Sequence, residues 1–285
     1  MPGPIGTRPV GNVTTPSTPP MPPKSYDVGS MSADELGKLK RTNPSLGKTI
    51  EDAKKTYGEF LSRTPPAKLM VTTTQANGGA PVLSIVPPGF DASKPATVQT
   101  HYHGDVTSVA AANGSHTGNI KEQLTKDPQR IWVLPEAQAN VGASSTNWNN
   151  VKDEAQTTRD ALAGAGVTPS DGTKYVVSAH SAGGRALAAA MKADSLKADQ
   201  LVLLDCLYES TNGPGAFSSI LNSVKNGGLD GVKDVVVVAT GSYPADRDAQ
   251  LRAAGGAKVR MEKLVPRQGL SNHEATARNH LVPRT

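Results

Sequence analysis

The stretch Tyr175-Val-Val-Ser-Ala-His-Ser-Ala-Gly-Gly184 decides the fold of this 285-residue chain. It begins as an apolar, β-rich run, and the helix-forming residues 185–193 follow it. A sharp turn between a strand and a helix exposes a central Ser above the sheet, and small neighbours avoid clashes at the strained backbone. Ala179 stands where Gly is more usual, and it is small enough for such a turn. The pattern therefore predicts Ser181 as a nucleophile.

Short β-rich runs recur on both sides of this stretch. They span residues 68–74, 82–86, 97–101, 131–134, 175–178, 201–204, 235–239 and 259–265. From the third run onward, segments of crossover length separate them, and two of the later runs are almost continuously apolar. Strands that are buried on both faces and alternate with helices are typical of parallel sheets. We expect an α/β protein with a mostly parallel eight-stranded sheet and helices on both faces.

The segments before the sheet differ in composition. Residues 1–30 hold eight of the 22 prolines, so we expect a disordered Pro-rich tail. Residues 31–66 are predicted to form a helical segment, because Ser32 to Glu35 reads as a capping box and residues 48–62 have apolar positions at helical spacing. Residues 67–285 are expected to form the α/β domain.

Composition and charge exclude several classes of protein. The net charge is +5, but no Lys/Arg tract has interleaved aromatic residues, so we expect no nucleic-acid partner. The single cysteine, Cys206, lies in an apolar run and is expected to be buried. No stretch approaches the length of a membrane span, and the N-terminus lacks the apolar region of a secretory signal. We expect a cytoplasmic protein, or one exported by a route that needs no signal peptide.

A second motif, Val98-Gln-Thr-His-Tyr-His-Gly-Asp105, follows the third predicted strand. Gly104 allows a close approach of the backbone, and the loop at this place can supply a donor to a developing oxyanion. We expect the N–H of Ala182 and the N–H of Gly104 or Asp105 to form this oxyanion site.

The histidines of this motif have several interpretations. His103 either orients the loop, contacts the substrate or has a purely structural role, and His101 is expected to pack. The string formed by His101, His103 and Asp105 also resembles a metal-binding pattern. The further ligand groups that such a site needs are missing, so we expect no metal.

A nucleophilic Ser needs a general base within hydrogen-bond reach. His273 lies in the loop 267–274 after the last predicted strand, where a base is expected, and His280 is the fallback. Of the other histidines, His116 falls in a polar loop and His180 belongs to the turn around Ser181.

The acid that would orient this base is less narrowly defined. Asp205 comes directly after an apolar strand and is sheltered by its neighbours, so we favour it. Asp246 and Asp248 follow the next strand and are the alternatives, and Glu209 is a remote option.

The loop 143–150 reads Ala-Ser-Ser-Thr-Asn-Trp-Asn-Asn and follows the fourth predicted strand. Trp148 and its Asn neighbours could bind a polar ligand, such as a sugar or a peptide. Alternatively, Trp148 packs at the start of a helix.

Residues 67–285 resemble the α/β-hydrolase superfamily. The motifs that carry the resemblance are His-x-His-Gly, small-His-Ser-x-Gly-Gly, Asp-x-Leu-Tyr and a late Ser-Asn-His, and they are similar to those of a little-described bacterial branch. The resemblance implies a Ser–Asp–His hydrolase without a cofactor. It leaves the substrate open, because this fold carries esterases, lipases and peptidases.

These observations lead to one expected function and two alternatives. We expect a serine hydrolase that cleaves a carboxylic ester of a polar or short-chain substrate through an acyl-enzyme on Ser181. Residues 207–233 leave room for about one helix, so no large lid domain is expected. The alternatives are an amidase or peptidase with the same triad, and a non-catalytic binding protein. The substrate would be a small-molecule or polymeric ester or amide, and the oligomeric state stays open.

Overall fold

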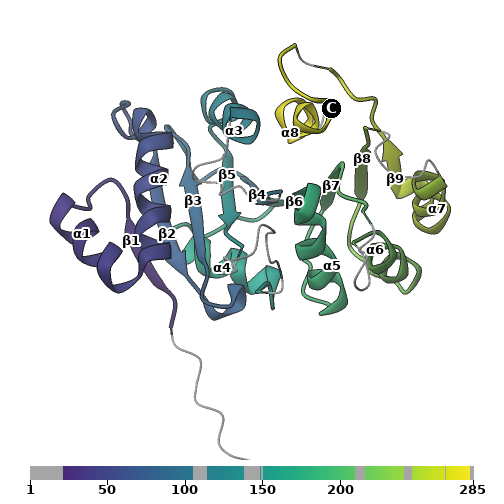
Figure 1. Cartoon of the computed structure of the whole chain (residues 1–285), viewed down its shortest axis with the longest axis horizontal. Helices are drawn as coiled ribbons and strands as arrows, with labels where there is room; N and C mark the ends of the chain where they lie inside the picture. The colour runs from purple at the N-terminus through teal and green to yellow at the C-terminus, as the bar shows by residue number, and fades with distance from the viewer. Residues whose placement is uncertain are drawn as a thin grey trace, which may run out of the picture.

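A twisted sheet runs through the part of the chain that the structure, a computed structural model, describes (Figure 1). The described residues are 22–104, 114–137, 148, 150–208, 216–240, 246–266 and 268–282. The strands are β1 Lys24–Asp27, β2 Lys68–Thr73, β3 Pro81–Val86, β4 Thr97–Tyr102, β5 Arg130–Pro135, β6 Lys174–His180, β7 Gln200–Leu204, β8 Asp234–Val238 and β9 Val259–Met261. The α-helices are α1 Ala33–Thr42, α2 Pro44–Leu61, α3 Gly114–Lys126, α4 Glu154–Gly164, α5 Gly184–Lys192, α6 Ala216–Lys225, α7 Asp246–Gly255 and α8 Asn272–His280. Short 3₁₀ turns are η1 Gln75–Asn77, η2 Ser181–Gly183 and η3 Gly256–Lys258.

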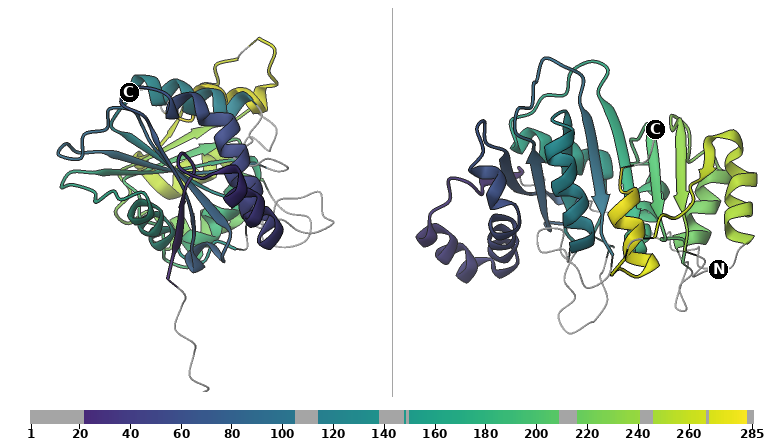
Figure 2. Two further views of the ribbon diagram at one scale, coloured as in Figure 1. Left: turned by 90° about the vertical axis from the view of Figure 1, so that its left-hand side faces the viewer. Right: turned by 90° about the horizontal axis from the view of Figure 1, so that it is seen from above.

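The strand order places the ends of the central strands together. The order is β1-β2-β3-β5-β4-β6-β7-β8-β9, and from β5 to β9 every neighbouring pair is parallel. The register pairs Tyr102 with Ala179, His180 with Leu204, and Leu204 with Val238. Because these strands run in one direction, the residues that follow β4, β6, β7 and β8 meet at one edge of the sheet. The strands fan out through the twist of the sheet in the left view of Figure 2.

Each predicted strand has a counterpart, and β1 is one strand more than the eight expected. β1 pairs antiparallel with β2, from Lys24 opposite Thr73 to Asp27 opposite Met70. The next residue, Val28, is buried. The predicted boundary of the Pro-rich tail at residue 30 is therefore wrong. Lys-Ser-Tyr-Asp has little apolar content, and β1 is held by the main-chain ladder that β2 offers at the sheet edge. Residues 1–21 of the predicted tail lie outside the described residues.

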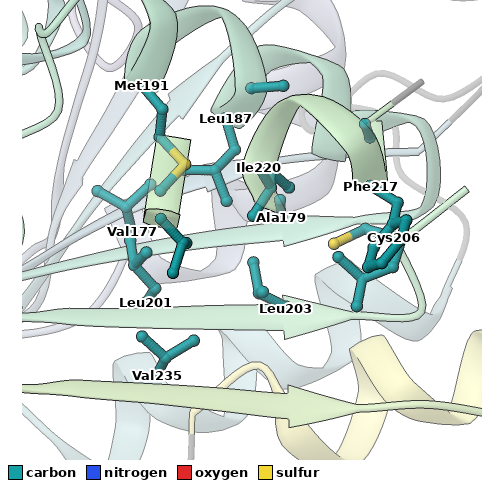
Figure 3. Close-up of a cluster of buried hydrophobic side chains, with 14 of the residues drawn as sticks. Val177, Ala179, Leu187, Met191, Leu201, Leu203, Cys206, Phe217, Ile220 and Val235 are labelled. Carbon is teal, nitrogen blue, oxygen red and sulfur yellow. The ribbon is translucent and has the colours of Figure 1, made fainter. Parts of the chain in front are cut away.

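Helices cover both faces of the sheet. On one face, α5, α6 and α7 pack against β6, β7 and β8, and Figure 3 shows the cluster formed there by Val177, Ala179, Leu187, Met191, Leu201, Leu203, Cys206, Phe217, Ile220 and Val235. On the opposite face, α2 and α3 pack against β2, β3 and β5. Alternation of side chains along each strand supplies both clusters. Cys206 is buried as expected, and burial raises the pKa of its thiol to about 12.

The first N-terminal helix begins at the predicted capping box, whereas α2 begins at Pro44, four residues before the predicted start of 48–62. Ser32 caps α1 in a capping box with Glu35, and Asn43 caps α2. The apolar side of α2 is buried against the sheet, in one cluster with residues of β2 and β3. α2 thus shares the core of the strands that follow it. None of the helices in the described ranges is long and apolar enough to cross a membrane.

Candidate active site

Ser181 lies in a tight turn between β6 and α5. β6 ends at His180, η2 covers Ser181–Gly183, and α5 begins at Gly184. The φ angle of Ser181 is +52°, in the left-handed region. A residue with a side chain is disfavoured there by about 1–2 kcal/mol, so the surrounding packing must hold it in place. The strand–turn–helix arrangement predicted around Ser181 is therefore present, with a strained backbone at its centre.

The two glycines after Ser181 allow this turn to approach other strands. A Cβ atom on Gly183 would clash with the carbonyl oxygen of Tyr102, at the end of β4, and one on Gly184 would clash with that of Cys206, after β7. Gly104, after β4, also lies beside the turn. A Cβ atom placed on it would be 3.1 Å from Cβ and 3.5 Å from Oγ of Ser181. The loop predicted to line the oxyanion site thus reaches the Ser181 side chain.

A buried carboxylate and a half-exposed imidazole form a close pair at the same edge. Nδ1 of His273, in the first turn of α8, lies 2.6 Å from Oδ2 of Asp205. Asp205 follows β7, is fully buried and has a φ angle of +44°. Because a carboxylate accepts, Nδ1 of His273 carries a proton and donates it to Asp205.

Two further side chains hold the Asp205 carboxylate. The Tyr208 hydroxyl donates to it at 2.9 Å, and the Thr240 hydroxyl at 2.8 Å. The Thr240 N–H lies 3.4 Å from the other carboxylate oxygen. These donors offset the cost of burying a charge. Sequence reasoning missed both roles, although Tyr208 belongs to the Asp-x-Leu-Tyr motif and Thr240 follows β8.

The alternative acids occupy other surroundings. Asp246 is exposed in the first turn of α7, where it accepts from Gln250 at 2.8 Å. Asp248 is half-buried in the same turn. Glu209 lies outside the described residues. Of the carboxylates considered from the sequence, Asp205 is the one that receives the His273 hydrogen bond.

His280, the fallback base, has a structural role. It is buried, its Nε2 accepts from the N–H of Val265 at 3.0 Å, and its Nδ1 lies 3.1 Å from a carboxylate oxygen of Glu262. Both ring nitrogens are therefore used to tie the segment after β9 to α8. Of the two histidines considered as a base, His273 is the one that is hydrogen-bonded to Asp205.

Three other buried histidines form a series of contacts that ends at His273. Nε2 of His101 lies 2.8 Å from Nδ1 of His116, and the rings of His116 and His180 are 4.7 Å apart. The ring of His180 is 4.4 Å from that of His273. The prediction that His116 falls in a polar loop is wrong, because it lies in α3 and faces the interior. Burial lowers the pKa of His180 to about 3, and the pKa values of His101 and His116 are also lowered well below normal, chiefly by burial.

The sequence and the structure were compared with those of known proteins. No family model and no curated protein matches the sequence. A solved ferulic acid esterase is similar, with a TM-score of 0.50 and 14% identity over 69% of this chain and 90% of its own. The chain has the α/β-hydrolase fold. A structure of fungal esterases from Rhizomucor miehei gives a TM-score of 0.49, with 13% identity over 87% of this chain and 89% of its own. A hormone-sensitive lipase from a metagenome library gives 0.42, with 17% identity over 81% and 87%.

In the α/β-hydrolase fold the nucleophile, the acid and the histidine follow one another along the chain in that order. Ser181 follows β6, Asp205 follows β7, and His273 lies in α8 after the last strand, so the three residues occur in this order. Ala182, the first of the expected oxyanion donors, lies in η2, where the N–H groups of a first turn lack acceptors within the helix. Asp105, another expected donor, lies outside the described residues.

The structure gives His103 a supporting place in the loop after β4. Its Nδ1 donates to the Gly104 carbonyl at 2.8 Å, and its Nε2 lies 3.4 Å from a carboxylate oxygen of Glu136. The side chain is buried. Of the three interpretations of His103, this geometry favours orientation of the loop. Within the described part of the chain, no group of three or more His, Cys, Asp or Glu side chains is arranged to hold a metal ion.

Trp148 is buried in the hydrophobic core, in one cluster with Tyr102. Its ring contacts Tyr102 edge-on at 5.2 Å and lies 4.8 Å from the ring of His103. The indole therefore packs behind the end of β4. This placement favours the packing interpretation over direct contact with a polar ligand.

Proposed function

We propose that this protein is a serine hydrolase that cleaves a carboxylic ester of a polar or short-chain substrate. One observation carries the proposal. Ser181 stands at a strained strand–helix turn, at the sheet edge where His273 is hydrogen-bonded to the buried Asp205. His180, the residue next to Ser181, contacts His273 directly, so the nucleophile and the base belong to adjoining parts of the site.

The position of the proton on His273 determines how Ser181 is activated in the first half of the reaction. Asp205 holds the proton on Nδ1, so Nε2 takes the proton of Ser181 as Oγ attacks the ester carbonyl carbon. The imidazolium that forms is stabilised by the carboxylate behind it. It then gives its proton to the leaving alcohol as the ester C–O bond breaks, which leaves an acyl group on Ser181.

Water completes the cycle. His273 takes a proton from a water molecule, which attacks the acyl carbon, and Ser181 leaves with the proton returned by His273. In each half, the negative charge that develops on the carbonyl oxygen is held by main-chain N–H groups. We assign this role to Ala182, with Gly104 or Asp105 as the second donor.

The preference for a polar or short-chain ester follows from the part of the chain that would cover the site. Between β7 and β8, the described residues contain one helix of ten residues, α6, which packs on the sheet. An enzyme that works at a lipid surface needs an apolar face to bind there. The described residues between β7 and β8 form no separate lid beside α6, so we propose a soluble ester as the substrate instead of a lipid aggregate.

A labelling experiment tests the mechanism. The wild-type protein and Ser181→Ala are treated with a fluorophosphonate probe and then assayed with a panel of p-nitrophenyl esters and peptide amides. We expect the probe to label Ser181 in the wild type alone, and short-chain esters to turn over fastest. Removing the nucleophile should reduce kcat by several orders of magnitude while the fold is retained.

Each contrary result has a distinct meaning. Faster cleavage of amides than of esters would indicate an amidase or peptidase with the same triad. Absence of both labelling and turnover would indicate a binding protein that retains the fold. Turnover that survives in a clean Ser181→Ala preparation would reject the mechanism.

A further inference from the structure

His180 joins the nucleophile turn to the helix that carries the base. Its Nε2 lies 3.0 Å from the main-chain carbonyl oxygen of His273. Since a carbonyl only accepts, Nε2 is the donor. The ring of His180 also lies against that of His273, with 4.4 Å between centroids and 38° between planes.

We infer that His180 is a positioning residue, which fixes the His273 imidazole relative to Ser181 through this hydrogen bond and ring contact. The inference rests on the proposed function, in which His273 is the base. His180 is the residue before Ser181 in the chain. Its hydrogen bond to the main chain of His273 therefore connects the nucleophile to the base through a single side chain. Asp205 sets the orientation of the ring, and His180 sets the position of the backbone from which the ring extends.

The alternative, a proton relay through the buried histidines, does not fit the contacts. A relay needs hydrogen bonds from ring nitrogen to ring nitrogen up to the base. The rings of His116 and His180 meet edge to face at 71°, and Nε2 of His180 points to a carbonyl instead of the His273 ring. Among the described residues, the His101–His116 pair therefore contacts His180 by ring packing, without a ring-to-ring hydrogen bond that continues to His273.

The protonation state of His180 suits a positioning role. With the proton on Nε2, Nδ1 of the neutral ring is bare, and within the described residues this buried atom has no hydrogen-bond partner. Burial, with the nearby His273 as the next cause, lowers the pKa of His180 to about 3. The ring therefore stays neutral while His273 gains a proton during the reaction, and no second positive charge opposes the imidazolium.

Thr276 also donates a hydrogen bond to the His273 carbonyl, but from within the same helix. The Thr276 hydroxyl donates to the same His273 carbonyl at 2.6 Å. Thr276 lies in α8 itself, so its bond ties the helix only to itself. The bond from His180 instead connects α8 directly to the turn that carries Ser181.

Three substitutions test the inference. His180→Phe keeps a flat ring and removes the donor. His180→Gln keeps a donor near the position of Nε2, while the shorter side chain of His180→Asn cannot reach the carbonyl. A misplacement of about 1 Å can cost about 100-fold in rate. We expect kcat for the best ester to fall by about 10- to 100-fold in His180→Phe and His180→Asn with KM nearly unchanged, and to recover to within about threefold in His180→Gln.

A readout independent of turnover separates this inference from the proposed function. The imidazole of His273 is titrated by NMR in the wild type and the three variants. We expect a shifted or broadened titration in His180→Phe and His180→Asn, and a wild-type titration in His180→Gln. If the wild type hydrolyses no ester but this pattern holds, the proposed function fails and the positioning role stands. If His180→Phe does not fold, the contrast between Asn and Gln decides. Wild-type kcat and titration in His180→Asn would overturn the inference.

Discussion

Nδ1 of His273 and Oδ2 of Asp205 lie 2.6 Å apart although 68 residues separate them in the chain. The carboxylate is fully buried, whereas the imidazole side chain is 37% exposed. The carboxylate is thus held in the interior, while the imidazole reaches solvent. The hydroxyls of Tyr208 and Thr240 complete the surroundings of the carboxylate.

The first prediction concerns this pair. Asp205→Asn should lower kcat by roughly 10⁴, because an amide no longer fixes the tautomer and orientation of the imidazole. Ester hydrolysis by the purified variant measures the effect. Asp246→Asn is the matched control, since Asp246 is exposed on α7, and it should change kcat little. A mild effect at Asp205 with a large effect at Asp246 would assign the acid to the segment after β8.

The second prediction concerns the glycine that closes the nucleophile turn. A Cβ atom on Gly183 would clash with the carbonyl oxygen of Tyr102, and main chain at a strand end cannot move away cheaply. Gly183→Ala should therefore lower the free energy of unfolding by about 1–3 kcal/mol and abolish ester hydrolysis. Urea denaturation measures the first effect.

Gly58 provides the control. It lies inside α2, and a Cβ atom there would meet no atom within 4 Å. Gly58→Ala should raise the free energy of unfolding by about 0.5–1 kcal/mol, because Ala favours a helix over Gly. Equal stability of the two variants would mean that the turn is not packed against β4.

The third prediction concerns Glu154, a buried residue at the start of α4. Burial raises the pKa of its carboxyl group from 4.5 to about 7. Below pH 4.5, both the folded and the unfolded chain carry the proton. Between pH 4.5 and about 7, the folded protein keeps it and the unfolded chain loses it, so the free energy of unfolding falls as the pH rises. Above that range the carboxyl group is ionised in both the folded and the unfolded chain. The decrease in the free energy of unfolding, on the order of 3 kcal/mol, then stays constant.

Glu154→Gln should remove this dependence. Its free energy of unfolding relative to the wild type should rise between pH 4.5 and pH 7. Denaturation in urea at several pH values measures the difference. Glu51→Gln is the control, because Lys40 lowers the pKa of this exposed carboxyl group and the variant should lose a little stability at neutral pH. A pH-independent difference at Glu154 would contradict the prediction.

The fourth prediction concerns the N-terminus. Deleting residues 1–30 removes β1 and the buried Val28, so it should lower the melting temperature by several degrees. Deleting residues 1–21 leaves every described contact of β1 in place and should change the melting temperature little. Thermal unfolding of both truncated proteins measures this. Equal melting temperatures would indicate that β1 adds nothing to the sheet.

Local sequence determined most of the elements. The strands from β2 to β9 were predictable because each is a short apolar run, and α1 because Ser32 and Glu35 form a capping box. The turn at Ser181 was also predictable from local sequence, because small residues between an apolar run and helix-forming residues are typical of a sharp turn from a strand into a helix. β1 was not, because Lys-Ser-Tyr-Asp carries no apolar pattern and its pairing depends on the neighbouring strand.

The partners within the site were decided by tertiary structure. From the sequence alone, Asp205, Asp246 and Asp248 all follow apolar strands, and His273 and His280 both follow the last one. Strand order and register bring Asp205 to His273 and place His280 on Val265 and Glu262. The contact of His180 with His273 arises in the same way. Hydrogen bonds between residues far apart in the chain depend on how strands are ordered and twisted, and no local pattern records that arrangement.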